Sequence, residues 1–242
     1  MNLEPTPVRD GDPDVIAVIP ARGGSKGIPG KNLAVVGGVP LVVRAVRTCL
    51  AASRVSTVVV STDDQAIADA ARQAGAVVVT RPADLSGDTA SSEEAVIHAL
   101  EVLYGRAADQ VDVVVLVQCT SPFATPGDID DVVQAVLAGA DTAFTAARVH
   151  GFLWRPEPDG AVEVNPHHKR RARRQERPVE LLETGAAYAM RGDGFWSRRR
   201  RFFGTVRAVE TAAERVLEID EPADLERARV LAPLFDAPAG RP

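Results

Sequence analysis

The chain has 242 residues, of which 45% are apolar and 25% charged, a balance typical of a globular protein with one sizeable core. Its net charge of −5 argues against a protein whose whole surface binds nucleic acid. The two cysteines, Cys49 and Cys119, are too few for a disulfide framework or a Cys-rich zinc site. The acidic, Pro-rich N-terminus does not resemble a signal peptide, and no run approaches the ~20 apolar residues that span a bilayer. We therefore expect a cytoplasmic protein with no membrane partner.

Apolar runs of strand length alternate with segments of helical spacing along the first 150 residues. In chain order the predicted elements are a strand at 15–20, a helix at 40–50, a strand at 55–60 and a helix from 64 to 74. A strand at 76–79, a helix at 89–103, a strand at 111–117, a helix at 126–137 and a strand at 142–147 follow. Asp64 is placed to cap the second helix, and Gly75 to end it. Because the strands are apolar on both faces and helices lie between them, the pattern predicts an α/β fold with a doubly wound, mostly parallel sheet.

The regular alternation stops near Val149. Residues 150–180 are rich in Pro, His and Arg and show no clear period, which indicates an inserted arm. Strand patterns return at 185–190 and 205–209, and a last helix is predicted at 221–231. We therefore expect a single domain over residues 1–242, with a core at about 14–148 and 185–232 and an arm at about 149–184.

A Gly-rich loop, ARGGSKGIPGKN at residues 21–32, follows the first predicted strand. Backbone N–H groups in such a loop can converge on one anion, and Arg22, Lys26 and Lys31 add three positive charges. A triphosphate requires that combination. The loop is neither a Walker loop, because Asn32 follows Gly30-Lys31, nor a Gly-x-Gly-x-x-Gly dinucleotide loop. An ordinary basic surface loop is the competing interpretation.

The string IPARGGSKGIPGKN at 19–32 resembles the signature of the acylneuraminate cytidylyltransferases, the CMP-sialic acid synthetases. Five further strings follow in the order and spacing of that family: VVVSTDDQAIADAA, RPADLSGDTASS, LVQCTSPF, RRQ followed by ETGAAY, and LEIDEPADL. The resemblance covers about residues 14–232. It implies a sheet with the nucleotide over the strand ends, and a homodimer or dimer of dimers in which an extended arm reaches over the partner's active site.

The resemblance also implies roles for individual residues. Phosphate and nucleotide contacts are expected from Arg22, Gly23, Gly24, Lys26, Lys31, Asn32, Ser61, Asp63, Arg81 and Asp88. The acid-sugar acceptor would meet Gln118, Ser121, Arg171, Arg174 and Gln175. Glu218 and Asp220 match the two acidic residues that hold a catalytic Mg²⁺. Arg22, Lys31 and Asp220 are the expected catalytic residues.

Several of these residues have a competing structural explanation. Asp63 could serve only as a helix cap, Asp88 could cap a turn, and Gln118 could satisfy local backbone groups. The basic cluster at 169–177 could be a solvated charge run or a weak RNA patch, and the run at 198–201 is interpreted as a solvated face. Cys119 is interpreted as a small apolar residue, because no neighbouring feature supplies a base or lowers its pKa.

Three positions depart from the family pattern. Thr184 stands where the family has Asn, Ala124 where it has Arg, and Glu218 where it often has Asp. The nucleotide half therefore matches better than the acceptor half. The expected reaction is transfer of CMP from CTP to a sialic-acid-like sugar, with release of pyrophosphate. The alternatives are the same chemistry on a KDO-like acid, a phosphonate or a sugar phosphate, or an inactive nucleotide- or RNA-binding relative; no nucleic-acid partner is expected for the enzyme.

Overall fold

The computed structural model describes residues 12–25, 27–87, 90–165 and 173–236. Its centre is a seven-stranded sheet. The strands are β1 (Val15–Pro20), β4 (Thr57–Thr62), β5 (Val77–Thr80), β6 (Val113–Val117), β7 (Thr142–Val149), β10 (Glu180–Arg191) and β11 (Val206–Glu210). Their order is β11-β7-β10-β6-β1-β4-β5, and β10 alone runs antiparallel to its neighbours. The predicted α/β fold with a mostly parallel sheet is confirmed.

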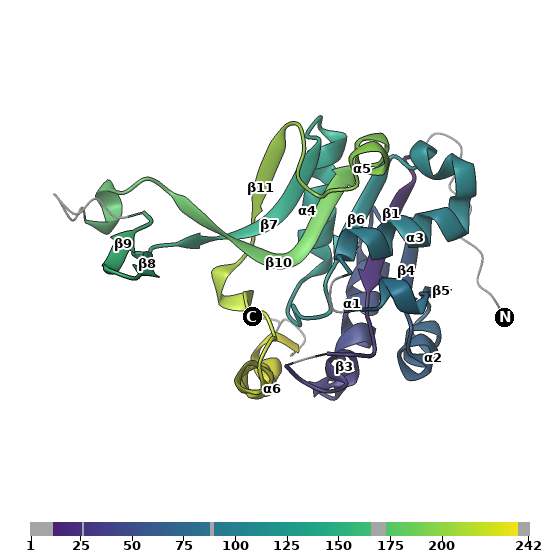
Figure 1. Ribbon diagram of the computed structural model, residues 1–242, viewed down its shortest axis with the longest axis horizontal. Coiled ribbons are helices and arrows are strands. Elements are labelled where there is room, and N and C mark those ends of the chain that lie inside the picture. The colour runs from purple at the N-terminus through teal and green to yellow at the C-terminus, as the bar shows by residue number, and fades with distance from the viewer. Residues whose placement is uncertain (1–11, 26, 88–89, 166–172, 237–242) are drawn as a thin grey trace, which may run out of the picture.

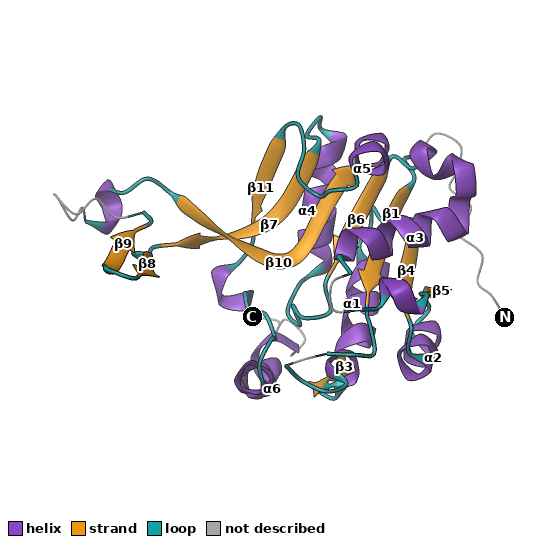
Figure 2. Ribbon diagram, in the orientation of Figure 1, coloured by secondary structure: helices purple, strands orange, loops and turns teal. Residues whose placement is uncertain are grey.

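Helices cover both faces of the sheet (Figure 2). They are α1 (Leu41–Ala51), α2 (Gln65–Gln73), α3 (Ser92–Tyr104), α4 (Pro126–Leu137), α5 (Gly192–Arg198) and α6 (Pro222–Asp236). Successive side chains of β1 point to opposite faces, as strand geometry requires. Val15, Ala17 and Ile19 pack in a core with α1, α2, α4 and α6, whereas Ile16 and Val18 pack in a second core with α3 and α5. Burial on both faces explains the unbroken apolar runs of the sequence.

Side-chain caps set the beginnings of three helices. The Asp64 carboxylate accepts a hydrogen bond from the Ile67 N–H (2.9 Å), as predicted. Ser91 and Glu94 form a capping box, so α3 begins at Ser92, three residues later than the apolar pattern indicates. Thr125 and Asp128 form a second capping box, and α4 begins at the predicted Pro126.

An arm extends from one side of the molecule (Figure 1). The outer parts of β7 and β10 pair beyond the sheet, from Glu180 opposite Val149 to Glu183 opposite Ala146. At its end is an antiparallel hairpin of β8 (Trp154–Glu157) and β9 (Gly160–Glu163). No strand pattern is visible in the sequence there, because almost every hairpin residue is exposed and neither strand alternates between apolar and polar residues.

Short elements complete the chain. A second hairpin pairs β2 (Val35–Val36) with β3 (Val39–Pro40). Five 3₁₀ turns, numbered η1 to η5, lie at Lys31–Leu33, Ala83–Leu85, Gly105–Gln110, Arg174–Glu176 and Ala213–Arg215. Within the described ranges, every helix is too short or too polar to cross a bilayer.

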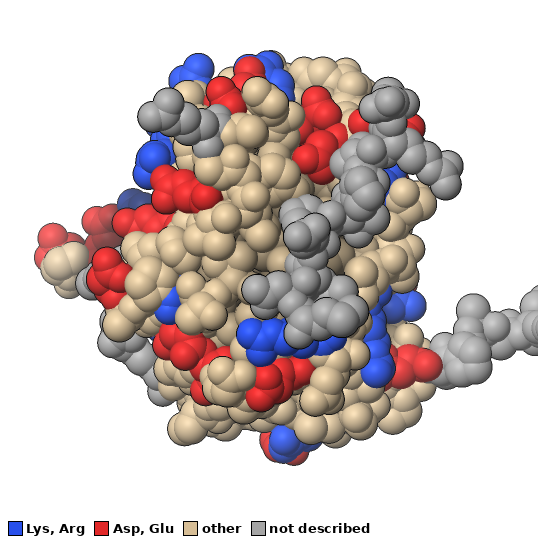
Figure 3. All heavy atoms as spheres, turned by 90° about the vertical axis from the view of Figure 1, so that its right-hand side faces the viewer, with Lys and Arg blue, Asp and Glu red and all other residues tan. Residues whose placement is uncertain are grey.

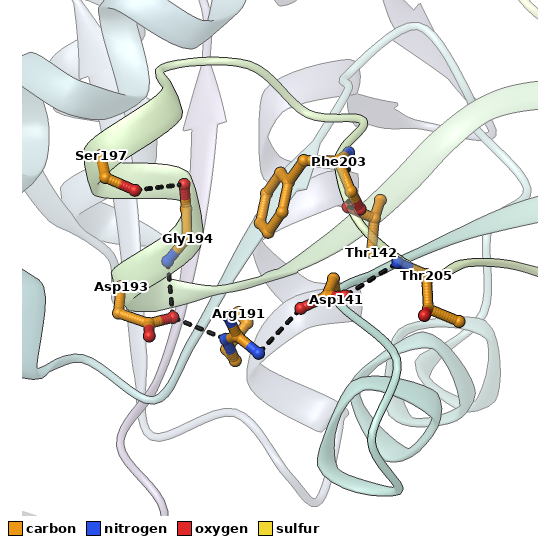
Figure 4. Close-up of polar contacts among 8 residues, drawn as sticks. All are labelled: Asp141, Thr142, Arg191, Asp193, Gly194, Ser197, Phe203 and Thr205. Carbon is orange, nitrogen blue, oxygen red and sulfur yellow. Dashed lines mark hydrogen bonds and ion pairs between the residues drawn. The ribbon is translucent and has the colours of Figure 1, made fainter.

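Ion pairs join neighbouring segments at the end of the sheet where β1, β6 and β7 begin (Figure 4). The Arg191 guanidinium bridges the Asp141 carboxylate (2.8 Å) and the Asp193 carboxylate (2.6 Å). The other Asp141 oxygen accepts a hydrogen bond from the Thr205 N–H (2.8 Å). Gly204 beside it has φ +56°, and a Cβ there would lie 2.0 Å from Asp141 Oδ2, so only glycine fits this turn.

Candidate functional site

A cleft of about 290 Å³ lies at the opposite end of the sheet, beyond the carboxyl ends of β1, β5 and β6. In open α/β sheets this is where ligands bind, because loops diverge there and leave a crevice. Eight of the residues expected in the site line this cleft: Arg22, Gly24, Lys31, Asn32, Arg81, Gln118, Glu218 and Asp220. Residues separated by almost 200 positions in the sequence thus share one cavity.

The Gly-rich loop is held in place by contacts to both of its sides. The Gly23 N–H donates to the Asp63 carboxylate (2.9 Å), and the Asn32 side-chain amide donates to the Arg22 carbonyl (2.9 Å). A Cβ on Gly27 would lie 2.2 Å from the Asp220 carbonyl oxygen. Glycine at position 27 therefore allows the loop to approach the segment that carries the acidic residues.

Three cationic side chains face the cleft. Lys31 Nζ donates to the Ile219 carbonyl (2.9 Å) and to the Asp220 carboxylate (3.2 Å). Arg22 donates to the Gly87 carbonyl (3.0 Å). Arg81 is buried, and burial lowers its pKa while Asp63 opposes that change; an arginine in this state still carries its charge. The arrangement concentrates positive charge where a polyphosphate would enter.

Ser61 and Asp63 do not line the cleft; they contact Arg81 and the Gly-rich loop, which do. Ser61 is fully buried, and its hydroxyl and carbonyl oxygens both accept hydrogen bonds from the Arg81 guanidinium. Asp63 accepts from the loop at Gly23 and does not cap α2, a role that Asp64 fills. The structure therefore gives these two residues a positioning role.

Two carboxylates, Glu218 and Asp220, line the same cleft. Burial raises the pKa of Glu218, the neighbouring Asp220 raises it further, and Lys31 opposes both effects. Gly185, at φ +75° in the irregular stretch of β10, leaves room for the Glu218 carboxylate, which would lie 3.0 Å from a Cβ there. A cation bridging the two acids would relieve their mutual repulsion.

The donor set suits a magnesium ion that arrives with a phosphate ligand. Across the described ranges, no group of three or more His, Cys, Asp or Glu side chains could form an all-protein metal cage. Magnesium commonly takes one or two carboxylates, and substrate phosphates and water complete its coordination. Glu218 and Asp220 fit that pattern.

The predicted acceptor residues are spread more widely. Gln118 lines the cleft, where its side-chain oxygen accepts from the Thr120 hydroxyl (3.4 Å). Ser121 instead lines a cavity of about 20 Å³ next to the cleft, and its buried hydroxyl has no partner among the described residues. Thr184 points to Thr145, with 2.6 Å between the two hydroxyl oxygens, and does not line the cleft. The threonine that stands here in place of the family's asparagine is therefore part of a buried hydrogen-bond network.

Arg174 and Gln175 are exposed on the arm, in η4, outside the set of residues that lines this chain's cleft. Lys26, Asp88 and Arg171, which were also expected to bind ligand, lie outside the described residues.

Cys119 lines the cleft but is not suited to act as a nucleophile. Burial raises the pKa of its thiol to about 12, although Lys31 opposes the rise. The thiol is therefore protonated at neutral pH, in agreement with its interpretation as a small apolar residue.

The structure corrects one expectation and adds two residues. Arg201 was assigned to a solvated face, but its guanidinium makes two hydrogen bonds to Glu93 (2.6 and 3.2 Å) and lies 4.5 Å from the centre of the Tyr188 ring. Ser91 and Ser92, which were not among the expected site residues, line the cleft at the beginning of α3. Their signal was present in the family-like string RPADLSGDTASS at 81–92.

Comparison with known proteins agrees with this geometry. The family model described as "Cytidylyltransferase" matches residues 16–227. The chain is 35% identical over 188 residues to N-acylneuraminate cytidylyltransferase A of Danio rerio, which covers 76% of this chain and 43% of that protein. It is 30% identical over 232 residues to 3-deoxy-manno-octulosonate cytidylyltransferase of Rhodopseudomonas palustris, covering 94% of this chain and 86% of that protein.

Among solved structures, a CMP:2-keto-3-deoxy-manno-octonic acid synthetase in complex with CTP has the same fold. It superposes with a TM-score of 0.69 at 21% identity, over 91% of this chain and 99% of that one. The chain spans less than half the length of the N-acylneuraminate cytidylyltransferases of fish that it matches. The match to the family model nevertheless extends over most of this chain and includes every segment that lines the cleft, so the chain belongs to the cytidylyltransferase family.

Proposed function

We propose that the chain transfers CMP from CTP to a sialic-acid-like, nonulosonic acid sugar and releases pyrophosphate. The observation that carries the proposal is the cleft, in which Arg22, Lys31 and Arg81 face Glu218 and Asp220 at the end of a parallel sheet. The 35% identity to an N-acylneuraminate cytidylyltransferase, which extends over 76% of this chain, supports this acceptor class.

Catalysis would come mainly from positioning and charge stabilisation. The acceptor hydroxyl oxygen forms a bond to the α-phosphorus of CTP while the bond from that phosphorus to the pyrophosphate oxygen breaks, and the hydroxyl proton passes to water. Arg22 and Lys31 hold the departing pyrophosphate and stabilise its charge. Cys119 forms no covalent intermediate, because its thiol stays protonated.

Glu218 and Asp220 would hold the magnesium ion. When bound, the ion supplies positive charge that polarises the phosphate and offsets the charge developed during transfer. Lys31 already contacts Asp220 and the Ile219 carbonyl, so the same lysine orients the acidic segment and meets the phosphates.

We further propose that two copies of the chain associate through the arm. The arm carries exposed apolar side chains that a partner could cover: Leu153, Trp154, Val162, Val164, Val179, Leu181 and Leu182. In such a homodimer, or dimer of dimers, Arg174 and Gln175 would serve the partner's cleft, which explains why they lie away from their own.

We place the reaction in the cytoplasm, where CTP is available, with no membrane or nucleic-acid partner. Acidic and basic side chains are interspersed on the face shown in Figure 3. Together with the net charge of −5, this distribution differs from the basic stripe that nucleic acids require.

The test is pyrophosphate release by the purified chain with CTP and magnesium and one acceptor at a time: sialic acid, a legionaminic-type acid, KDO, or a sugar 1-phosphate. We expect turnover with a nonulosonic acid, and with CTP in preference to UTP, GTP, ATP or dTTP. Turnover confined to KDO or to a sugar phosphate would overturn the acceptor assignment.

Two variants test the residue roles in the same assay. Arg22→Ala should lower turnover by ~10²-fold or more, the size typical of losing one preorganised charge donor. Asp220→Asn should abolish magnesium-dependent turnover while the circular dichroism spectrum stays unchanged. Undiminished activity of folded Asp220→Asn would place the metal elsewhere.

A further inference from the structure

A second cavity, of about 640 Å³, lies beside the cleft and shares no lining residue with it. It is open to solvent and is lined by α1, the loop that enters α4, η5 and the end of α6. Figure 1 shows α6 beside α1 and β3, at the side of the sheet away from α3. The function proposed above uses none of these residues.

Positive charge dominates the cavity. Three guanidinium groups, of Arg44, Arg47 and Arg215, face one carboxylate, that of Asp236. Arg44 and Asp236 form a two-bond ion pair (2.5 and 2.8 Å), and Arg44 also donates to the Val36 and Pro122 carbonyls. The charges of Arg44 and Asp236 are therefore paired without a ligand, which leaves the positive charges of Arg47 and Arg215.

Within the described ranges, neither the Arg47 guanidinium nor the Arg215 guanidinium has a hydrogen bond or an ion pair. Arg47 is exposed on α1. Arg215 is half-buried and lies 4.9 Å from the centre of the Phe235 ring. Two unpaired guanidinium groups that face one concave surface favour an anion between them, and guanidinium geometry matches phosphate in particular.

Two aromatic residues, Phe123 and Phe235, are part of the lining of this cavity. Phe123 is almost fully buried, and its ring centre lies 4.8 Å from that of Phe235 at an interplanar angle of 49°. A cavity with cations at its rim and aromatic rings in its wall binds an anion that carries a flat, partly apolar ring. A nucleoside monophosphate has both parts.

The cavity is connected to the cleft through two short segments. Gln118 and Thr120 line the cleft, whereas Pro122 and Thr125 of the same loop line the second cavity. Arg215 lines the second cavity and lies three residues before Glu218 of the cleft. The Ile219 N–H donates to the Thr120 carbonyl (2.9 Å), so a backbone hydrogen bond joins the two segments where they meet.

We propose that this cavity is a second ligand site, which takes a nucleoside monophosphate or a similar phosphorylated ring compound and alters turnover in the cleft. A ligand held by Arg47 and Arg215 would contact both segments that carry Gln118 and the two acidic residues. Any difference in its affinity between two arrangements of those segments changes binding in the cleft by the same factor. The effect on turnover rests on the proposed function, but binding does not.

The experiment measures binding of AMP to the full chain by calorimetry, with and without saturating CTP. AMP serves as the probe because its base differs from the cytosine expected in the cleft. Ribose 5-phosphate and inorganic phosphate test whether the ring and the sugar contribute. We expect AMP to bind in the presence of CTP, and more tightly than either smaller probe.

Variants of the arginines test whether AMP binds in this cavity. Arg47→Ala combined with Arg215→Ala should weaken AMP binding at least ~10-fold, because each change removes a charge-assisted hydrogen bond. Arg54→Ala, at an exposed arginine just beyond α1 and outside the cavity, is the matched control and should bind as the wild type does. AMP should change pyrophosphate release by the wild type and leave release by the double variant unchanged.

The results separate this proposal from the proposed function. Normal CTP turnover without AMP binding at millimolar concentration overturns the second site alone, as does AMP binding that CTP displaces or that the double variant retains. Arginine-dependent AMP binding by a chain that turns over no CTP would support the site and overturn the proposed function.

Discussion

The two ends of the sheet use the same residue types in different ways. Where β1, β6 and β7 begin, Arg191 is held between two carboxylates, and Asp141 is further satisfied by the backbone at Thr205. At the other end, Lys31 and Arg81 donate largely to carbonyl and hydroxyl oxygens, and Glu218 stays close to Asp220 with a raised pKa.

This difference separates a structural end from a functional end. Fully paired charges hold loops together but have little capacity to bind anything else. Cations that donate to neutral oxygens can still pair with the charges of a triphosphate. Two acids held near each other repel, and a divalent ion bound between them would remove that repulsion. Replacing residues at each end should therefore affect different quantities.

The largest effect is expected at Lys31. Lys31→Ala removes a phosphate-facing charge and the contact to Asp220, so turnover should fall by ~10²-fold or more in the pyrophosphate assay. Thermal unfolding should change little, because the lysine contributes to the cleft and not to the core. Wild-type turnover in a folded Lys31→Ala protein would contradict the assignment of the cleft.

A second prediction concerns Arg201, which the sequence pattern places on a solvated face, and its partner Glu93. Arg201 and Glu93 are both mostly buried, with side-chain exposures of 19% and 17%, so Arg201→Ala leaves a desolvated carboxylate without its partner. We expect a loss of about 2 kcal/mol in the free energy of unfolding, measured by urea denaturation. A double-mutant cycle with Glu93→Gln isolates the pair. A coupling near zero would show that the contact contributes nothing.

At the structural end, Arg191→Ala should lower the free energy of unfolding by less than about 1 kcal/mol, because half of its side chain is exposed and water screens the pair. Turnover should not change. A tenfold loss of activity in this variant would show that the two ends are coupled and that the end near Arg191 is not purely structural.

The smallest effect is expected at Asp14, an acid at the structural end whose pKa is raised. Burial is the main cause, Ser56 opposes it, and Asp112 adds repulsion. The folded state holds this proton more tightly than the unfolded chain does, so wild-type stability falls as pH rises through the folded-state pKa. Asp14→Asn should therefore gain up to ~0.5 kcal/mol at neutral pH and nothing below about pH 4. Urea denaturation at both pH values measures the difference.

Local signals predicted most of the fold. Buried strands appear as apolar runs, and caps such as Asp64 and Thr125 act within three residues of their own position. Elements without a local apolar pattern were missed. The β8–β9 hairpin is exposed on both faces, and α5 is a seven-residue helix that contains two glycines.

The sequence by itself determined the chemical types at the site: a flexible, cationic loop after the first strand and two acids near the C-terminal end of the chain. Only the tertiary structure decided which of those residues share the cleft. It brought Lys31 to Asp220, turned Thr184 to Thr145, and placed Ser61 and Asp63 behind the residues that face the ligand. Residue type and local spacing are properties of short segments. Convergence depends on strand order and on the irregular stretch of β10, which arise from pairing between strands that are distant in the sequence, such as Val15 opposite Val113 and Met190 opposite Thr142.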